Sequence, residues 1–288
     1  MAALSGEMKQ NRRRTAKLWF VLAVIFVVPG MARGGPEGEK NSFSPEREAT
    51  RFRAAKYLAS KILVFSKTAG WRHSSIPAGI TAIRQLGTAN GFEVHSTEDA
   101  TTFTDTNLAR YRAVVFLNTT GNVLTDVQQR AFESYIRAGH GFVGVHAAAD
   151  TELSNWPWYR ELVGAYFVSH PQVQMATIRV ENRSHPSTAR LPILWVRTDE
   201  WYNYDRNPRS RVQVLMTVDE STYTGGAMAP DHPIAWYREY DGGRAWYTGL
   251  DHTDATYSEP LFRSHLLGGI QWAAAVSTTS AVRWRSYE

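Results

Sequence analysis

The sequence of 288 residues contains no cysteine. This absence excludes disulfide bonds, thiolate metal sites, iron–sulfur clusters and a cysteine nucleophile. A large surplus of charge is also missing from most of the chain, although the formal net charge is +5. Residues 1–32 hold five basic residues and one acidic residue, which leaves a net charge of about +1 for residues 33–288. No Lys/Arg-rich block occurs there, so nucleic acid is not an expected partner.

The N-terminal segment has the pattern of a secretory signal peptide. Residues 9–17 are basic, residues 18–28 form an unbroken apolar run, and Pro29, Gly30 and Ala32 follow. The apolar run is shorter than the ~20 residues that a spanning helix needs. Residues 1–32 therefore predict a signal peptide, with an uncleaved membrane anchor as the alternative. We expect an exported protein, periplasmic or extracellular, that meets a membrane only through this segment before cleavage.

The remainder predicts one α/β domain. Residues 33–59 are rich in Gly, Pro and polar residues and predict a flexible leader that could include a short helix. No internal repeat or second linker interrupts residues 60–276, and residues 277–288 read as a C-terminal tail. The first part of the domain has the order β-α-β-α-β-α-β, with strands expected at 61–66, 92–96, 113–117 and 142–146 and helices at 75–89 and 125–138.

The apolar character of these strands indicates the fold class. Strands that are apolar without interruption are covered on both faces, which favours a three-layer α/β/α architecture with a mostly parallel sheet. Beyond residue 170 the pattern is rich in strands, expected at 174–180, 193–196, 212–218, 234–237 and 244–247, and a last helix is expected at 258–274.

Three histidines follow predicted strands directly, where open α/β sheets bind ligands. His73 lies after the first strand, His146 ends the fourth, and His252 follows the last. The small residues after His146 have the pattern of a nucleophile elbow, a sharp turn from strand to helix. Asp150 could share the face of His146 or cap a helix. Each histidine could act as a base, a metal ligand or a hydrogen-bond donor, or could be a loop or core residue.

Residues 199–204 (DEWYNY) place two carboxylates among three aromatic residues. If the segment is extended, Glu200 and Tyr202 point one way and Trp201 the other. Aromatic faces beside carboxylates suit a sugar, and an aromatic wall would raise the pKa of Glu200 towards that of a general acid. The alternative is an edge strand with surface aromatics.

Metal-binding motifs of short spacing are absent: the chain has no H-x-H and no H-E-x-x-H. Any metal site must therefore come from distant segments, with His73, His146 and His252 as candidates and zinc as a candidate ion. His170 and His185, like His232, precede a proline, which holds them in extended geometry.

Seven stretches carry a resemblance to a known family: AGWRHSSI (69–76), GHGFVGVHAAADT (139–151), YRELVGAYFVSHP (159–171), HPST (185–188), DEWYNY (199–204), HPIAWYREYDGGRAWYTGLDHT (232–253) and LLGGIQWA (266–273). They resemble the trehalose-utilisation (ThuA-like) family. The resemblance implies a flavodoxin-like fold of the class I glutamine amidotransferase type and a role in the metabolism of trehalose or oxidised (3-keto) glycosides. It also implies that His146 stands where amidotransferases carry their cysteine, so glutaminase activity is excluded. Asp251 departs from the family pattern, which has glycine before the histidine.

The leading hypothesis is an exported enzyme, a lyase, hydrolase or isomerase, that acts on a small carbohydrate by acid–base or metal-assisted chemistry. His146 would be base or ligand, and His73, His252, Glu200 and Asp150 would be its catalytic partners. The expected substrate-binding residues are Trp71, Arg72, His170, His185, Trp201 and Tyr202. The alternative is a non-catalytic carbohydrate-binding or scaffold module on the same fold.

Overall fold

A computed structural model describes residues 60–153 and 156–275. The predicted signal peptide (1–32), the leader (33–59) and the tail (277–288) lie outside these residues, so those predictions stay open. Among the described helices, none is long and apolar enough to cross a membrane.

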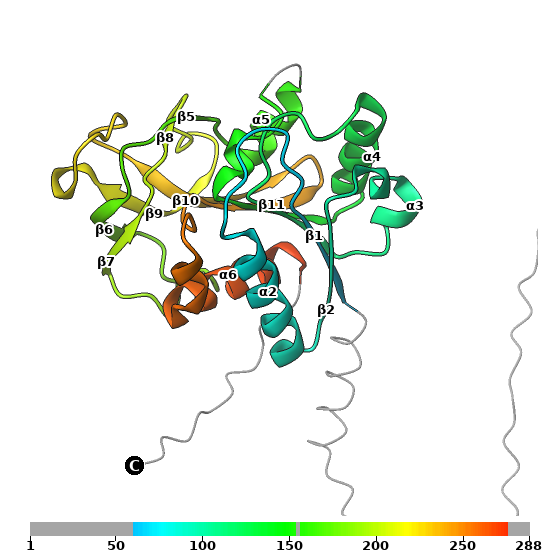
Figure 1. Ribbon diagram of the computed structural model, residues 1–288, viewed down its shortest axis with the longest axis horizontal. Helices are drawn as coiled ribbons and strands as arrows, with labels where there is room; N and C mark the ends of the chain where they lie inside the picture. Colours follow the sequence, from blue (N-terminus) through cyan, green and yellow to red (C-terminus); the bar gives the residue numbers. More distant parts are fainter. Residues whose placement is uncertain (1–59, 154–155, 276–288) are drawn as a thin grey trace, which may run out of the picture. The chain divides into compact units, whose positions relative to one another are not determined.

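The centre of the fold is a nine-stranded sheet in the order β2-β1-β3-β4-β11-β10-β9-β6-β7 (Figure 1). Its parallel half comprises β2 (Glu93–Thr97), β1 (Lys61–Phe65), β3 (Ala113–Leu117), β4 (Gly141–Val145) and β11 (Gly243–Thr248). Every residue of β3 and β4 is buried, as expected for strands with helices on both faces. The predicted three-layer α/β architecture is confirmed.

The other half of the sheet is antiparallel. It comprises β10 (Pro233–Tyr240), β9 (Gln213–Asp219), β6 (Gln174–Val180) and β7 (Leu194–Asp199). Exposed and buried residues alternate along β7, so one face of this edge strand meets solvent. The strand continues past its predicted end at residue 196 to Asp199, which places Glu200 directly after it. A separate ribbon pairs β5 (Phe167–Ser169) with β8 (Asn203–Tyr204).

Helices cover both faces of the sheet. Figure 1 shows α2 (Ile76–Asn90) and α6 (Pro260–Ala273) on one face, and α4 (Asp126–Arg137) and α5 (Pro157–Val163) on the other. A capping box of Thr125 and Gln128 starts α4. The remaining helical elements are single turns: α3 (Asp105–Leu108), η1 (Ala100–Thr102), η2 (His146–Asp150), η3 (Glu220–Thr222) and η4 (Asp254–Ser258).

The expected helix between β2 and β3 is replaced by two of these turns, η1 and α3. The side chains of Asp99 and Thr104 each accept a backbone N–H and begin a turn of their own. Two such caps within six residues break the segment, because each one holds its own backbone in an extended conformation at the start of a turn.

Candidate functional site

The sharp turn expected at His146 is present. His146 is the first residue of η2, directly after β4, and its φ of +48° lies in the left-handed region that side chains rarely adopt. Its Nδ1 lies 2.8 Å from the carbonyl oxygen of Gly249. Since a carbonyl only accepts, Nδ1 carries the proton, and Nε2 on the other side of the ring is turned toward the cluster.

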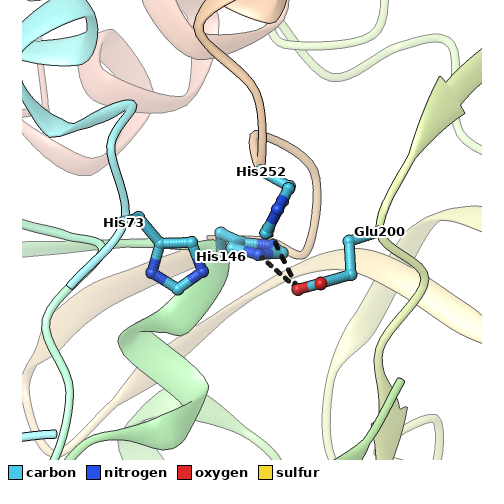
Figure 2. A group of neighbouring side chains, drawn as sticks. All are labelled: His73, His146, Glu200 and His252. Carbon is cyan, nitrogen blue, oxygen red and sulfur yellow. Dashed lines mark ion pairs between the residues drawn. The ribbon is translucent and has the colours of Figure 1, made fainter. Parts of the chain in front are cut away.

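That side faces three other polar side chains (Figure 2). His73 comes from the loop after β1, Glu200 follows β7 and His252 follows β11. The four residues His73, His146, Glu200 and His252 each offer a nitrogen or oxygen, and these atoms all lie within 4.8 Å of one another. We call this group the histidine–glutamate cluster. The sequence pointed to all four residues, and the fold assembles them from four separate segments.

The carboxylate of Glu200 joins the cluster at short range. Its Oε2 lies 3.3 Å from Nε2 of His146 and 3.1 Å from Nδ1 of His252. Its Oε1 lies 3.0 Å from Nδ1 of His170, which also lies 3.0 Å from the carbonyl oxygen of Pro171. The ring of His73 stands nearly perpendicular to those of His146 and His252, at centroid distances of 5.0 and 5.2 Å. Three imidazoles and one carboxylate thus surround a single point.

Burial and mutual contact set the protonation of the cluster. Burial lowers the pKa of His73 to about 3, helped by the neighbouring imidazoles of His146 and His252. Burial acts to raise the pKa of Glu200, but contacts with His146 and His252 outweigh it and hold that pKa well below its usual value. In return, Glu200 raises the pKa of His252. The expected general-acid pKa of Glu200 is therefore wrong, because the carboxylate contacts imidazoles that favour its charged form.

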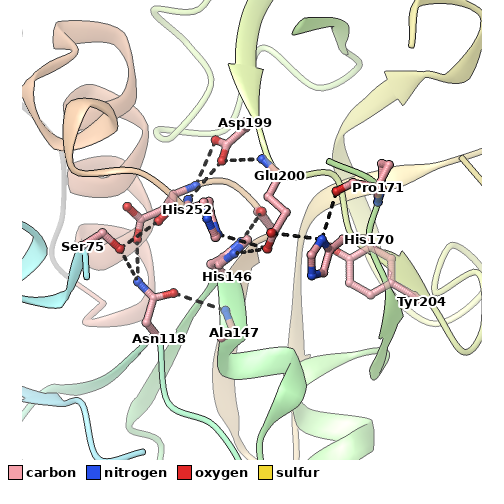
Figure 3. A network of polar contacts seen from close by, with 12 residues as sticks. Ser75, Asn118, His146, Ala147, His170, Pro171, Asp199, Glu200, Tyr204 and His252 are labelled. Atoms are coloured by element: carbon pink, nitrogen blue, oxygen red, sulfur yellow. Dashed lines mark hydrogen bonds and ion pairs between the residues drawn. The ribbon is translucent and has the colours of Figure 1, made fainter. Parts of the chain in front are cut away.

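A buried carboxylate brings two of these segments together (Figure 3). Asp199 accepts the backbone N–H groups of Asp251 and His252, each at 3.0 Å, and also that of Glu200. Arg197 pairs with Asp199 at 3.0 Å and neutralises it. Asp199 therefore fastens the loop after β11 to the end of β7, which holds His252 beside Glu200.

Residues with positive φ follow three neighbouring strands at this site: Asn118 (+50°) directly after β3, His146 (+48°) directly after β4, and Asp251 (+109°) in the loop beyond β11. The amide of Asn118 donates to Oγ of Ser75 at 3.3 Å and to the carboxyl of Asp251 at 3.4 Å, and Tyr257 also donates to that carboxyl. Backbone strain of this kind persists where the surroundings enforce it, and it gathers at functional sites.

The family model for ThuA, described as trehalose utilisation, matches residues 61–273. The chain belongs to the ThuA family. A crystal structure of a ThuA-like protein from Bacteroides uniformis is similar at 26% identity and a TM-score of 0.65, covering 75% of this chain and 91% of that one. A ThuA-like protein from Parabacteroides merdae gives the same TM-score at 22% identity, covering 77% and 92%. A comparison with curated proteins finds no match.

These findings confirm the resemblance and the flavodoxin-like fold, and they support a carbohydrate-related role. The structure also shows where the side chain of Asp251 lies. The family pattern has glycine at this position, where a side chain at the mouth of the site could alter it. Instead the side chain of Asp251 is fully buried, and burial raises its pKa well above the usual value. Its φ is one that glycine adopts easily, which explains why glycine suits this position.

The expected sugar platform is largely wrong. Trp201 is fully buried and donates its indole N–H to the carbonyl of Gln174. Tyr202 is also buried, and its ring packs on that of His146 with centroids 4.1 Å apart. Neither ring presents a face to a ligand, because both fill the core behind the cluster. Trp71, by contrast, is 73% exposed, and the adjacent Arg72 pairs with Glu98 at 2.7 Å.

His185 and Asp150 lie outside the cluster. His185 packs against Tyr237 and Trp272, and among the described residues none of its contacts is with the cluster. Its predicted role in substrate binding is wrong, because the fold places it in the core, where burial lowers its pKa to about 4. Asp150 ends η2, partly buried. Burial raises its pKa, while His146 lies near enough to oppose that shift.

Sequence reasoning did not assign a role to Asn118 or Asp199. Asn118 has the same sequence pattern as His146, because it is the first polar residue after an apolar strand. Asp199 carried only its place beside Glu200. Its function depends on bonds to residues 251 and 252, and neither hydrophobic periodicity nor motif spacing reports such a distant contact.

Proposed function

We propose that this chain is an exported carbohydrate-active enzyme of the ThuA family and that the histidine–glutamate cluster is its reaction centre. One observation carries the proposal: four chemically reactive side chains converge at the carboxyl ends of the strands. Buried imidazoles with unmet hydrogen bonds lower the stability of the fold. A reactive role therefore explains this cluster better than a packing role does.

The solvent exposure of part of the cluster supports the binding of a substrate there. The side chains of His252 and His170 are 27% and 42% exposed, whereas His146 and Glu200 are buried. One side of the cluster therefore opens to solvent. Trp71, two residues before His73, offers an exposed aromatic face of the kind that stacks on sugars. We propose that a sugar binds over this side.

The chemistry available is proton transfer next to a carbonyl group. A keto-sugar has a removable C–H proton beside its ketone, so elimination or isomerisation needs only a base and a group that stabilises the oxyanion. An imidazole of the cluster can supply the base. Asp150, whose pKa is raised, is the candidate acid. No thiol is present, so acyl transfer from glutamine is not a competing reaction.

The test is to identify products by mass spectrometry after incubating the chain with trehalose and with its 3-keto derivative. We expect turnover of the oxidised sugar, and loss of turnover in a His146→Ala, Glu200→Gln double variant. His95→Ala serves as a matched control, because His95 lies on β2 and contacts Glu93 and Tyr111 rather than the cluster. Binding of these sugars without any product would favour a carbohydrate-binding module instead.

A further inference from the structure

We infer that the histidine–glutamate cluster binds one divalent transition-metal ion, with zinc as the reference ion. The inference concerns the site of the proposed function, but it is tested by metal binding and does not depend on turnover. It also decides between the two roles that the sequence left open, because His146 would then be a ligand and not a base.

The spacing of the donor atoms fits one ion. Zinc binds nitrogen and oxygen at about 2.0–2.1 Å, so two ligands at the corners of a tetrahedron lie about 3.3–3.4 Å apart. Nε2 of His146 lies 3.3 Å from Oε2 of Glu200, and Nδ1 of His252 lies 3.1 Å from the same oxygen. His73 completes a set of four donors whose atoms fall within 4.8 Å of one another.

The nitrogens that face one another lack other partners. Nε2 of His146 and Nδ1 of His252, which both face the carboxylate of Glu200, are buried, and among the described residues neither has a hydrogen-bond partner of acceptable geometry. Buried polar atoms without a partner are rare and costly. Protonating both rings here would bring like charges together. A single cation beside Glu200 satisfies both nitrogens at once.

The surroundings hold the donors as metal ligands are usually held. Nδ1–H of His146 donates to Gly249, which fixes the tautomer and turns the lone pair of Nε2 into the cluster. Ligating histidines nearly always make this second hydrogen bond to a carbonyl or carboxylate. His170 contacts the outer oxygen of Glu200, and Asp199 anchors the backbone of Glu200 and His252.

The donor set indicates the class of ion. Imidazole nitrogens suit zinc, iron, nickel and copper, whereas calcium and magnesium prefer a shell of oxygens. The only carboxylate in the group is Glu200. The three imidazoles are neutral as ligands, so a divalent ion keeps one net positive charge after Glu200 binds. Because His252 and His170 are partly exposed, the ion can also accept water or a substrate oxygen from the open side.

The experiment measures metal on the folded protein. The full chain is purified without chelator, its metal content is measured by elemental mass spectrometry, and the stripped protein is titrated with zinc chloride and cobalt chloride. We expect one equivalent of zinc and a visible absorption band from bound cobalt. Replacing a residue that only orients a ligand typically costs about 10–100-fold in affinity, so the loss of a direct ligand in Glu200→Gln or His252→Ala should exceed about 100-fold. His95→Ala should bind as wild type does.

Two of the variants should still fold, so a loss of zinc binding in them can be assigned to the lost ligand. Glu200→Gln preserves shape, and His252 lies on a partly exposed loop, so both should fold, which circular dichroism checks. Folded wild type that binds less than about a tenth of an equivalent would overturn the inference, as would equal binding by all variants. Zinc binding without sugar turnover would contradict only the proposed function. Sugar turnover by a wild type that binds no zinc would contradict only the metal site.

Discussion

Two groups of buried histidines share this fold, and their ring nitrogens differ in what they contact. His232 bonds to Glu220 and to the carbonyl of Tyr202, and His265 bonds to the carbonyl of Ser187 and the hydroxyl of Thr248. Both nitrogens of each ring are therefore satisfied. In the cluster, by contrast, each of His73, His146 and His252 has a buried nitrogen without such a partner among the described residues.

The difference separates His232 and His265 from the cluster, but an unpartnered nitrogen alone does not mark a functional histidine, because Nε2 of the core residue His185 also lacks a partner among the described residues. Burial alone does not distinguish the groups, since His265 and His146 are both completely buried. In His232 and His265, both ring nitrogens are hydrogen-bonded within the core. In the cluster, Nε2 of His146 and Nδ1 of His252 face the carboxylate of Glu200 instead. We therefore expect substitutions in the two groups to act on different properties of the protein.

The largest expected effect is on activity. His146→Ala should lower turnover of a keto-sugar by at least about 100-fold, the lower limit for loss of a group that acts directly in proton transfer or charge stabilisation. Without metal, stability should fall less than for a core histidine that makes two hydrogen bonds, because His146 makes one, to the carbonyl of Gly249. Parallel kinetics and thermal unfolding check this. A loss of stability matching the loss of activity would place His146 with the structural group.

The reverse pattern is expected for His265→Ala. The substitution removes two hydrogen bonds and leaves a cavity in the core, which should lower the free energy of unfolding by about 2–4 kcal/mol. Metal content and turnover of the folded fraction should remain those of wild type. Urea titration measures the first, and assays well below the unfolding temperature measure the second. Loss of metal from His265→Ala would show that a core histidine also controls metal binding, which would contradict the difference between the core histidines and the cluster.

Metal removal should sharpen the comparison further. A ligand that binds only the folded state, at a free concentration about 100 times its Kd, stabilises that state by about 2.7 kcal/mol. Chelation should therefore lower the unfolding temperature of wild type and of His265→Ala but leave Glu200→Gln unchanged. Differential scanning calorimetry with and without chelator makes the comparison. An equal shift in all three proteins would point to metal bound elsewhere.

The last expected effect is on the pH dependence of stability. Burial lowers the pKa of His265 to about 3 from an ordinary value of 6.5. Below pH 6.5 the unfolded chain takes up a proton at this residue and the folded chain does not, so stability falls as pH drops from about 6.5 to 3. The slope is about 1.4 kcal/mol per pH unit for one group.

His265→Asn removes this titration while keeping an N–H donor for Ser187. The variant should lose stability less steeply than wild type between about pH 6 and 4, as followed by denaturant titration at each pH. Slopes that are the same for both proteins would mean that His265 is protonated in the folded state.

Much of this arrangement could be predicted from the sequence, for reasons visible in particular residues. The apolar strands before His146 and Asn118 and the alternation that puts Glu200 and Tyr202 on one side are local patterns, so periodicity reports them. The turn at His146 followed from the small residues after it. The burial of Trp201 and Tyr202 could not be predicted, because it depends on the packing of the antiparallel strands. The lowered pKa of Glu200 depends on rings from other segments.

The most direct test of the metal centre is anomalous diffraction at the zinc absorption edge from crystals of zinc-loaded wild type. We expect one peak within about 2.0–2.2 Å of Nε2 of His146, Nδ1 of His252 and a carboxylate oxygen of Glu200, with His73 as the fourth protein ligand. A fully loaded crystal with no peak at this point, or with its peaks at surface histidines such as His95, would contradict the central claim.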